Sequence, residues 1–165
     1  TFRRDLHTAE EVRVGITMLC DEIAYRLREE GKKCTVVQVS IKDADFYTIQ
    51  RQRTLQSPTW LQSELIEQAM SLVLANWRGG TQIRMLTVAA HGLVDSDMVT
   101  QQLSLFDEPQ NQARSERAEK LEAALTQIRR KRGKDSVYRG VYDQKELGLS
   151  NRKARPVRRK VDDED

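Results

Sequence analysis

The sequence predicts an α+β domain with elements in the order βαββαβ: a four-stranded antiparallel sheet with two helices on one face, followed by a largely extended or disordered tail with one helix. Residues 8–31 and 58–78 repeat apolar side chains at steps of three and four, which predicts two amphipathic helices. Residues 34–42, 46–55 and 83–90 are rich in β-branched side chains, which predicts strands. This order leaves one face of the sheet open to solvent or to a partner.

The first strand is expected at residues 1–6 and the first helix at residues 8–31. Thr8 with Glu11 three residues later forms a capping-box pattern, and Gly31 is suited to end the helix. The apolar stripe of this helix consists of Val12, Ile16, Leu19, Cys20, Ile23 and Leu27.

The two central strands are expected to pair as a hairpin. Residues 43–45, Asp-Ala-Asp, lie between them and read as a polar turn, because Asp favours turns. Residues 57–59, Ser-Pro-Thr, have the chemistry of a helix start and predict that the second helix begins there. Residues 83–90 supply the last strand.

Beyond residue 100 large apolar side chains become rare, which predicts a polar extension. One helix is expected in it, with Ala118, Leu121, Leu125 and Ile128 on one stripe and four bases in the last turn before Gly133. The predicted organisation is a domain at 1–95, a linker with a binding peptide at 96–111, a helical tail at 112–149 and a disordered charged end at 150–165.

The charge of the chain is nearly balanced, with 28 bases, 25 acids and a formal net charge of +3. This balance excludes a uniformly basic coat for nucleic acid, so any contact with a polyanion must be local. The predicted helices carry more acids than bases, whereas the strands and their connections carry more bases. We therefore expect the sheet side to be positive and the helix side negative.

Cys20 and Cys34 are the two cysteines of the sequence. Their number and spacing predict neither a disulfide framework nor a zinc site, and they favour a reducing cytoplasm. No stretch approaches 18 uncharged apolar residues, so no membrane association is expected. The first residues resemble neither a signal peptide nor an initiator methionine, and we expect the chain to be part of a longer protein.

No constellation in the sequence predicts a catalytic, cofactor-binding or metal site. His7 and His91 have no serine or cysteine partner at a readable spacing, and lone histidines are usually structural. Asp43 with Asp45 is best explained by the hairpin turn.

The clearest functional signal is an apolar cluster in the polar linker, Gln102-Leu103-Ser104-Leu105-Phe106. Leu103, Leu105 and Phe106 cannot bury themselves in an extended linker, so we interpret the segment as a docking peptide with an aromatic anchor. The alternative is that it folds back on the domain as a final strand.

The pentapeptide QLSLF resembles the sliding-clamp binding peptide of bacteria. Residues 1–6, 45–55 and 83–88, in this order and followed by QLSLF, are similar to the C-terminal little-finger domain of Y-family translesion DNA polymerases of the DNA polymerase IV type, the DinB or ImpB-MucB-SamB group. The resemblance covers residues 1–106.

The resemblance implies a monomeric domain that grips the phosphates of primer-template DNA in the major groove without reading sequence. By position it implies DNA contacts at Arg51, Arg53 and Arg84, with Arg3, Arg4 and Lys42 as weaker candidates, and clamp contacts at Gln102, Leu103, Ser104, Leu105 and Phe106. It also implies that a preceding part of the protein is a DNA-directed DNA polymerase for damage tolerance. Two-metal phosphoryl transfer, with magnesium as the expected cofactor, would occur there and not in this segment, which is expected to hold no cofactor.

Two alternatives stay open. One is a standalone, non-catalytic accessory protein that joins DNA to the clamp. The other is a ferredoxin-like regulatory or RNA-binding domain, since a fold does not fix a function. The latter ranks last because the usual RNA-stacking strand motif is absent and only Phe46 and Tyr47 stand together.

Overall fold

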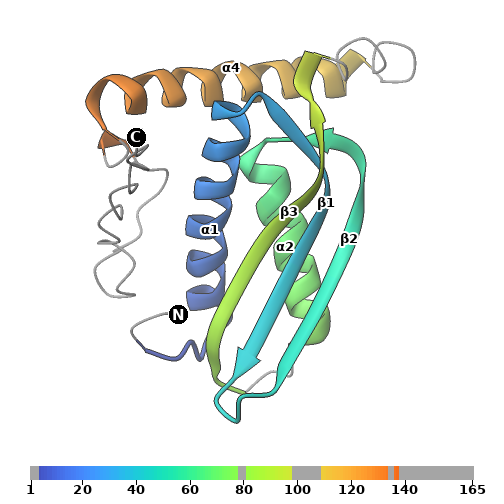
Figure 1. Ribbon diagram of the computed structural model, residues 1–165, viewed down its shortest axis with the longest axis vertical. Coiled ribbons are helices and arrows are strands. Elements are labelled where there is room, and N and C mark those ends of the chain that lie inside the picture. Colours follow the sequence, from blue (N-terminus) through green and yellow to red (C-terminus); the bar gives the residue numbers. More distant parts are fainter. Residues whose placement is uncertain (1–3, 78–80, 98–108, 134–135, 138–165) are drawn as a thin grey trace, which may run out of the picture.

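The computed structural model describes residues 4–77, 81–97, 109–133 and 136–137. In chain order its elements are α1 (Ala9–Glu29), β1 (Lys32–Asp43), β2 (Thr48–Thr59), α2 (Gln62–Asn76), β3 (Ile83–Asp95) and α4 (Pro109–Arg132). The strands form one antiparallel sheet in the order β2-β1-β3. Helices α1 and α2 cover one face of it, and α4 crosses the end of the domain where α1 finishes and β1 begins (Figure 1). The α+β class and the helical layer are as predicted.

Of the expected fourth strand, the described residues form a single β-bridge. Leu6 pairs with Ile83 in antiparallel sense, through hydrogen bonds of 2.8 Å from Leu6 N to Ile83 O and 2.9 Å from Ile83 N to Leu6 O. Residues 1–3 lie outside the described part of the chain. The described residues therefore form a three-stranded sheet with one bridge on the outer side of β3, and a four-stranded sheet is not confirmed.

Helix α1 begins where the sequence predicts, because its capping box is complete. Thr8 Oγ1 accepts a hydrogen bond from Glu11 N at 3.2 Å, and the Glu11 carboxylate accepts one from Thr8 N at 3.2 Å. These bonds satisfy main-chain donors that the first helical turn leaves unpaired. At the other end Gly31 has φ +62°, a left-handed conformation that glycine adopts without strain.

The predicted start of the second helix at residues 57–59 is wrong, because these residues extend β2. The partners of β1 jump from Thr54, opposite Val36, to Thr59, opposite Cys34, so β2 carries extra residues here. Proline has no N–H to donate to a sheet, so Pro58 is tolerated at such an irregularity. Helix α2 begins at Gln62. Just before it, Leu61 N donates a hydrogen bond to Thr59 Oγ1 at 3.0 Å.

The core lies between the sheet and the two helices. Val37, Val39 and Ile41 of β1 point into it, and alternation along the strand sends Gln38 and Ser40 to the opposite face. The largest fully buried side chains are those of Leu6, Ile16, Leu65, Ile83, Val12, Val37, Val39, Val73, Cys20 and Cys34. None of the helices in the described ranges is long and apolar enough to cross a lipid bilayer.

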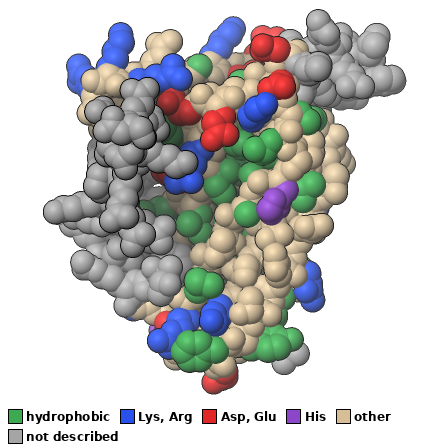
Figure 2. All heavy atoms as spheres, in the orientation of Figure 1, with side chains coloured by type: hydrophobic (Ala, Val, Ile, Leu, Met, Phe, Trp, Pro, Cys, Tyr) green, Lys and Arg blue, Asp and Glu red, His purple; other side chains and the backbone are tan. Residues whose placement is uncertain are grey.

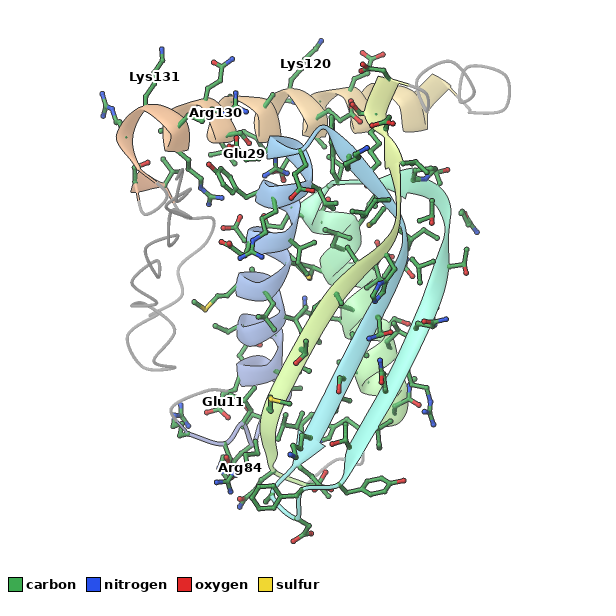
Figure 3. The ribbon with its side chains drawn as sticks, in the orientation of Figure 1. Glu11, Glu29, Arg84, Lys120, Arg130 and Lys131 are labelled. Carbon is green, nitrogen blue, oxygen red and sulfur yellow. The ribbon has the colours of Figure 1, made fainter. Side chains whose placement is uncertain are left out.

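Helix α4 confirms that the extension holds a helix, and the apolar stripe of this helix is only partly covered, with Ala118 and Leu125 half-buried. Leu121 is 52% exposed and Ile128 40%, whereas Glu122, Thr126 and Arg129 are buried. The helix faces the domain with polar side chains because the end of α1 presents charges. The ion pairs across this contact are Arg28–Glu122 at 2.9 Å, Arg129–Asp21 at 2.9 Å, Lys33–Glu119 at 3.0 Å and Arg130–Glu29 at 2.6 Å. Figure 3 labels Arg130 of α4 and Glu29 of α1.

Candidate nucleic-acid interface

The open face of the sheet is polar and almost without charge along its length. The register places Ser40 of β1 beside Gln50 of β2 and Thr87 of β3. Figure 2 views this face, and the surface over the strands is mainly that of uncharged polar groups. The hydrogen-bonding side chains that share it are Gln38, Ser40, Thr48, Gln50, Gln52, Thr54, Thr87 and His91. Positive charge thus lies at the ends and edges of this face and not across it.

One end of the open face carries a group that we name the tip cluster: Lys42, Phe46, Tyr47 and Arg84. It lies at the turn that joins β1 to β2, at the end of the domain opposite α4 (Figures 1 and 3). Lys42 Nζ is 5.1 Å and Arg84 Cζ 4.7 Å from the centroid of the Phe46 ring. These are cation–π distances, so the ring brings the two positive groups together.

Arg51 and Arg53 do not lie on the open face with Lys42. They pair with Val39 and Val37, whose side chains face the helices, so both arginines leave β2 on the helix side. Arg51 Nε donates to Asn76 Oδ1 at 3.1 Å, and Arg53 Nη1 donates to Gln68 Oε1 at 3.2 Å and to Ser71 Oγ at 3.1 Å. The expectation that the basic strand residues share one face is therefore corrected, and the DNA-binding role of these two residues stays a prediction.

The other predicted contacts are at the N-terminus and in the linker. Arg4 Nη1 forms an ion pair with Glu11 at 2.6 Å, beside the start of α1. Arg3 and the predicted clamp peptide, residues 102–106, lie outside the described residues. Their roles stay predictions.

The remaining titratable candidates are used structurally. Burial raises the pKa of Cys20 to about 12 and that of Cys34 to about 11, so both core thiols stay neutral and unreactive near pH 7. Asp43 holds the hairpin turn, as predicted, by accepting from Tyr47 N at 2.8 Å. Within the described ranges no three His, Cys, Asp or Glu side chains gather as metal ligands would.

The tip cluster as a unit is the feature that sequence reasoning missed. The sequence predicts phosphate contacts for Lys42 and Arg84. It connects Phe46 and Tyr47 only with an RNA-stacking motif, which belongs to the alternative that ranks last. The signal that identifies the cluster is the placement of two aromatic residues at a polar turn directly before an exposed strand. The contact of Arg84 with Phe46 depends on the pairing of β3 with β1 and could not be read from spacing.

Taken together, these features define an α+β binding domain with one polar face left open and a cationic, aromatic cluster at one end of it. The family model of the impB/mucB/samB family C-terminal domain matches residues 1–105. The chain therefore belongs to this family, the C-terminal domains of Y-family DNA polymerases.

Two curated relatives agree with this assignment. DNA polymerase IV of Acetivibrio thermocellus is 35% identical over 141 residues, which cover 86% of this chain and 34% of that protein. DNA polymerase IV of Pelotomaculum thermopropionicum is 33% identical over 141 residues, which cover 86% of this chain and 33% of that protein. A solved complex of the beta-clamp processivity factor and the little finger domain of PolIV has 23% identity and a TM-score of 0.44, covering 53% of this chain and 78% of that one. The chain spans about a third of the length of these DNA polymerase IV proteins.

Proposed function

We propose that this domain grips DNA without reading its sequence and serves as the little finger of a translesion DNA polymerase. The observation that carries the proposal is the open face of the sheet, a polar, uncharged surface bounded at one end by the unpaired cations of the tip cluster. A domain that binds DNA without sequence preference contacts phosphates and sugars. Arginine and lysine make such contacts, and serine, threonine and glutamine side chains make them too.

The dimensions of the sheet suit one turn of a duplex. The twelve residues of β1 span roughly 40 Å at about 3.3 Å per residue. One turn of B-DNA is roughly 34 Å long. A duplex laid along the strands would meet neutral hydrogen-bonding groups in its middle and Lys42 with Arg84 at one end. Arg51 and Arg53, on the outer strand β2, would contact a backbone that reaches over this edge.

The chemistry of synthesis is assigned to a different part of the protein. Two-metal phosphoryl transfer needs carboxylates that converge on cations, and the described residues hold no such cluster. We therefore place no step of the reaction on the described residues, and magnesium stays an expectation for the preceding part of the protein. A polymerase assay of the longer protein distinguishes this proposal from a standalone accessory protein.

Attachment to the sliding clamp is the second part of the proposal. Residues 102–106, Gln-Leu-Ser-Leu-Phe, are proposed as the docking peptide, with Leu105 and Phe106 as the buried anchors. A weak grip that ignores sequence cannot select a primer end, whereas attachment to a clamp on the same DNA raises the local concentration of the domain there.

Fluorescence anisotropy over a salt series tests the DNA grip. We expect weak binding to duplexes of different sequence with equal affinity and a steep loss of affinity as salt rises. Lys42→Gln with Arg84→Gln should lower the slope of log affinity against log salt by about 2, since each phosphate contact contributes about 0.9.

Arg51→Gln with Arg53→Gln is the comparison pair. It should lower the slope less, because α2 already holds both guanidinium groups through hydrogen bonds. If only this second pair changes the slope, the duplex lies against the β2 edge and not along the open face. Binding that is independent of salt would contradict the proposed grip itself.

A further inference from the structure

The turn between β1 and β2 presents two neighbouring aromatic side chains to solvent. Phe46 is 60% exposed and Tyr47 68%. The other large apolar side chains that are exposed in the described residues lie on α2, α4 and the far end of β3. Adjacent exposed rings at the end of a hairpin add nothing to the core, so a binding partner is the physical reason to examine.

The backbone at this turn is strained. Phe46 has φ +66°, a left-handed conformation in which glycine and asparagine are favoured and a bulky side chain is disfavoured. Asp43 maintains it: Asp43 O accepts from Phe46 N at 3.2 Å, Asp43 Oδ1 accepts from Tyr47 N at 2.8 Å, and Asp43 N donates to Tyr47 O at 3.1 Å. Strain that the surroundings hold in place is typical of functional sites.

The cations of the tip cluster have no acidic partner. Among the described residues, neither Lys42 nor Arg84 is part of an ion pair, although both lie about 5 Å from the Phe46 ring. Figure 2 shows basic, apolar and acidic side chains together at this end of the molecule. The turn also carries Asp43 and Asp45, but Asp43 accepts from the backbone of the turn and neither acid forms an ion pair with these cations. Two positive groups beside the same ring that are not held by a carboxylate match a phosphate, which arginine contacts with two parallel donors.

We propose that the tip cluster binds an unpaired nucleotide of a nucleic-acid strand. Tyr47 stacks on the base, Lys42 and Arg84 contact the flanking phosphates, and Phe46 holds the two cations in place. Bases inside a duplex are stacked on both faces, whereas an unpaired base can turn a free π face to an aromatic side chain. This inference rests on the proposed DNA grip and extends it: a duplex along the open face would continue at this end as single-stranded template.

The test compares a blunt duplex with the same duplex carrying a single-stranded template overhang, using the intact 165-residue chain. A 2-aminopurine base in the overhang reports stacking through its fluorescence. We expect the overhang to be bound more tightly than the blunt duplex and 2-aminopurine to be quenched. Tyr47→Ala should weaken binding of the overhang by about tenfold, the usual effect of losing one stacked base, and should leave the blunt duplex unchanged.

Two further variants keep the result interpretable. Phe46→Asn places a residue that tolerates positive φ in the turn, so it should fold with an unchanged or raised melting temperature while it weakens binding of the overhang. Leu93→Ala removes an exposed apolar side chain at the other end of the sheet and should leave the ratio of the two affinities unchanged.

The outcomes separate this inference from the grip on which it rests. If Tyr47→Ala and Phe46→Asn bind both DNAs as the parent does, or if 2-aminopurine is not quenched, the tip cluster is not a nucleotide site, and binding of the blunt duplex still supports the grip. If the parent chain binds neither DNA, the proposed function fails together with this inference.

Discussion

Glu11 illustrates how one side chain fixes the start of the domain. Its carboxylate accepts hydrogen bonds from His7 N at 2.7 Å and Thr8 N at 3.2 Å, and it pairs with Arg4 at 2.6 Å. The hydrogen bond from the His7 main chain is the main reason that the pKa of Glu11 lies below its ordinary value of 4.5. The bond from Thr8 and the charge of Arg4 act in the same direction. The ionised form is therefore the one that the fold stabilises.

A pH dependence follows from this lowered pKa. The stabilisation by Glu11 is complete above pH 4.5, the ordinary pKa, and is lost as the pH falls through the lower pKa of the folded state. Glutamine can keep the capping-box hydrogen bond, so Glu11→Gln removes mainly the charge and should cost at most about 1 kcal/mol near pH 7, and the difference from the parent should shrink below pH 4.5. Urea unfolding over a pH series measures both effects, with Glu10→Gln as the control in the same turn. A deficit that is constant down to pH 3 would contradict this account.

The backbone conformation and the close packing at position 92 require a glycine. Its φ is +62°, and a Cβ there would lie 2.0 Å from Thr35 Oγ1, which donates to Gly92 O at 3.0 Å. Gly92→Ala must therefore displace Thr35 as well as adopt a strained conformation, and we expect a loss of about 2 to 3 kcal/mol. Gly133→Ala is the control, because it has φ +96° and nothing within 4 Å of the added atom. Thermal unfolding should show a clearly smaller effect at Gly133, and equal losses would rule out the contact with Thr35 as the cause.

Among the elements, α4 is attached to the domain in an unusual way, through charged groups. The Arg28–Glu122 pair joins two side chains that are only 6% and 3% exposed, and Arg28 also donates to Thr126 Oγ1 at 2.9 Å and to Trp60 O at 3.2 Å. A buried pair of this kind is a poor source of net stability, but removing one partner leaves an uncompensated buried charge. The contact thus depends on Glu122 being present and ionised.

Glu122→Gln should consequently loosen α4 from the end of α1. We expect a cost of up to about 3 kcal/mol, because the buried Arg28 keeps its charge and loses this ion pair. Arg130→Gln is the matched control on the same helix: the side chains of Arg130 and its partner Glu29 are 57% and 34% exposed, so the cost should be below about 1 kcal/mol. Hydrogen exchange of the α4 amides measures the release, and equal exchange in both variants would show that the buried pair does not hold the helix.

The elements also show how far the sequence can predict this fold. Helix α1 was predicted with its start correct, because the capping box is a local signal. Two features depend on the register of β2 and could not be predicted: its irregularity at Pro58, and the side of the sheet on which Arg51 and Arg53 lie. The part of α2 that these arginines meet is polar, so no apolar alternation along β2 reveals its orientation. For α4 the sequence predicts an apolar stripe but not what the helix packs against, because Glu122 and Arg129 are buried by partners on α1 that are distant in sequence.

At the scale of the whole molecule, the candidate surfaces occupy opposite ends. The tip cluster lies at one end of the sheet, whereas Asp97 and Pro109, which flank the segment with the docking peptide, belong to the end where α4 lies (Figure 1). The pentapeptide and the order of the strands were sufficient to predict the family from sequence. The tip cluster could not be predicted in the same way, because its contacts form only when β3 pairs with β1.

This separation leads to a prediction about the docking peptide. Leu105→Ala with Phe106→Ala should weaken binding to the sliding clamp by at least tenfold, since anchors of this kind are commonly worth about 2 kcal/mol each and about 1.4 kcal/mol is a factor of ten. Calorimetry with the cognate clamp measures this loss. Binding of blunt duplex DNA should be unchanged, because the variant leaves the open face and the tip cluster intact.

Leu121→Ala is the control for the docking peptide, because it removes an exposed apolar side chain of α4 that lies outside the pentapeptide. If the control weakens clamp binding and the double variant does not, the clamp contacts the exposed stripe of α4. If neither changes the affinity, residues 102–106 are not the anchor, and the alternative in which they fold back on the domain as a strand gains support. Loss of DNA binding in the double variant would show that the two surfaces are not independent. Leu105 and Phe106 would then contribute to DNA binding as well as to clamp binding.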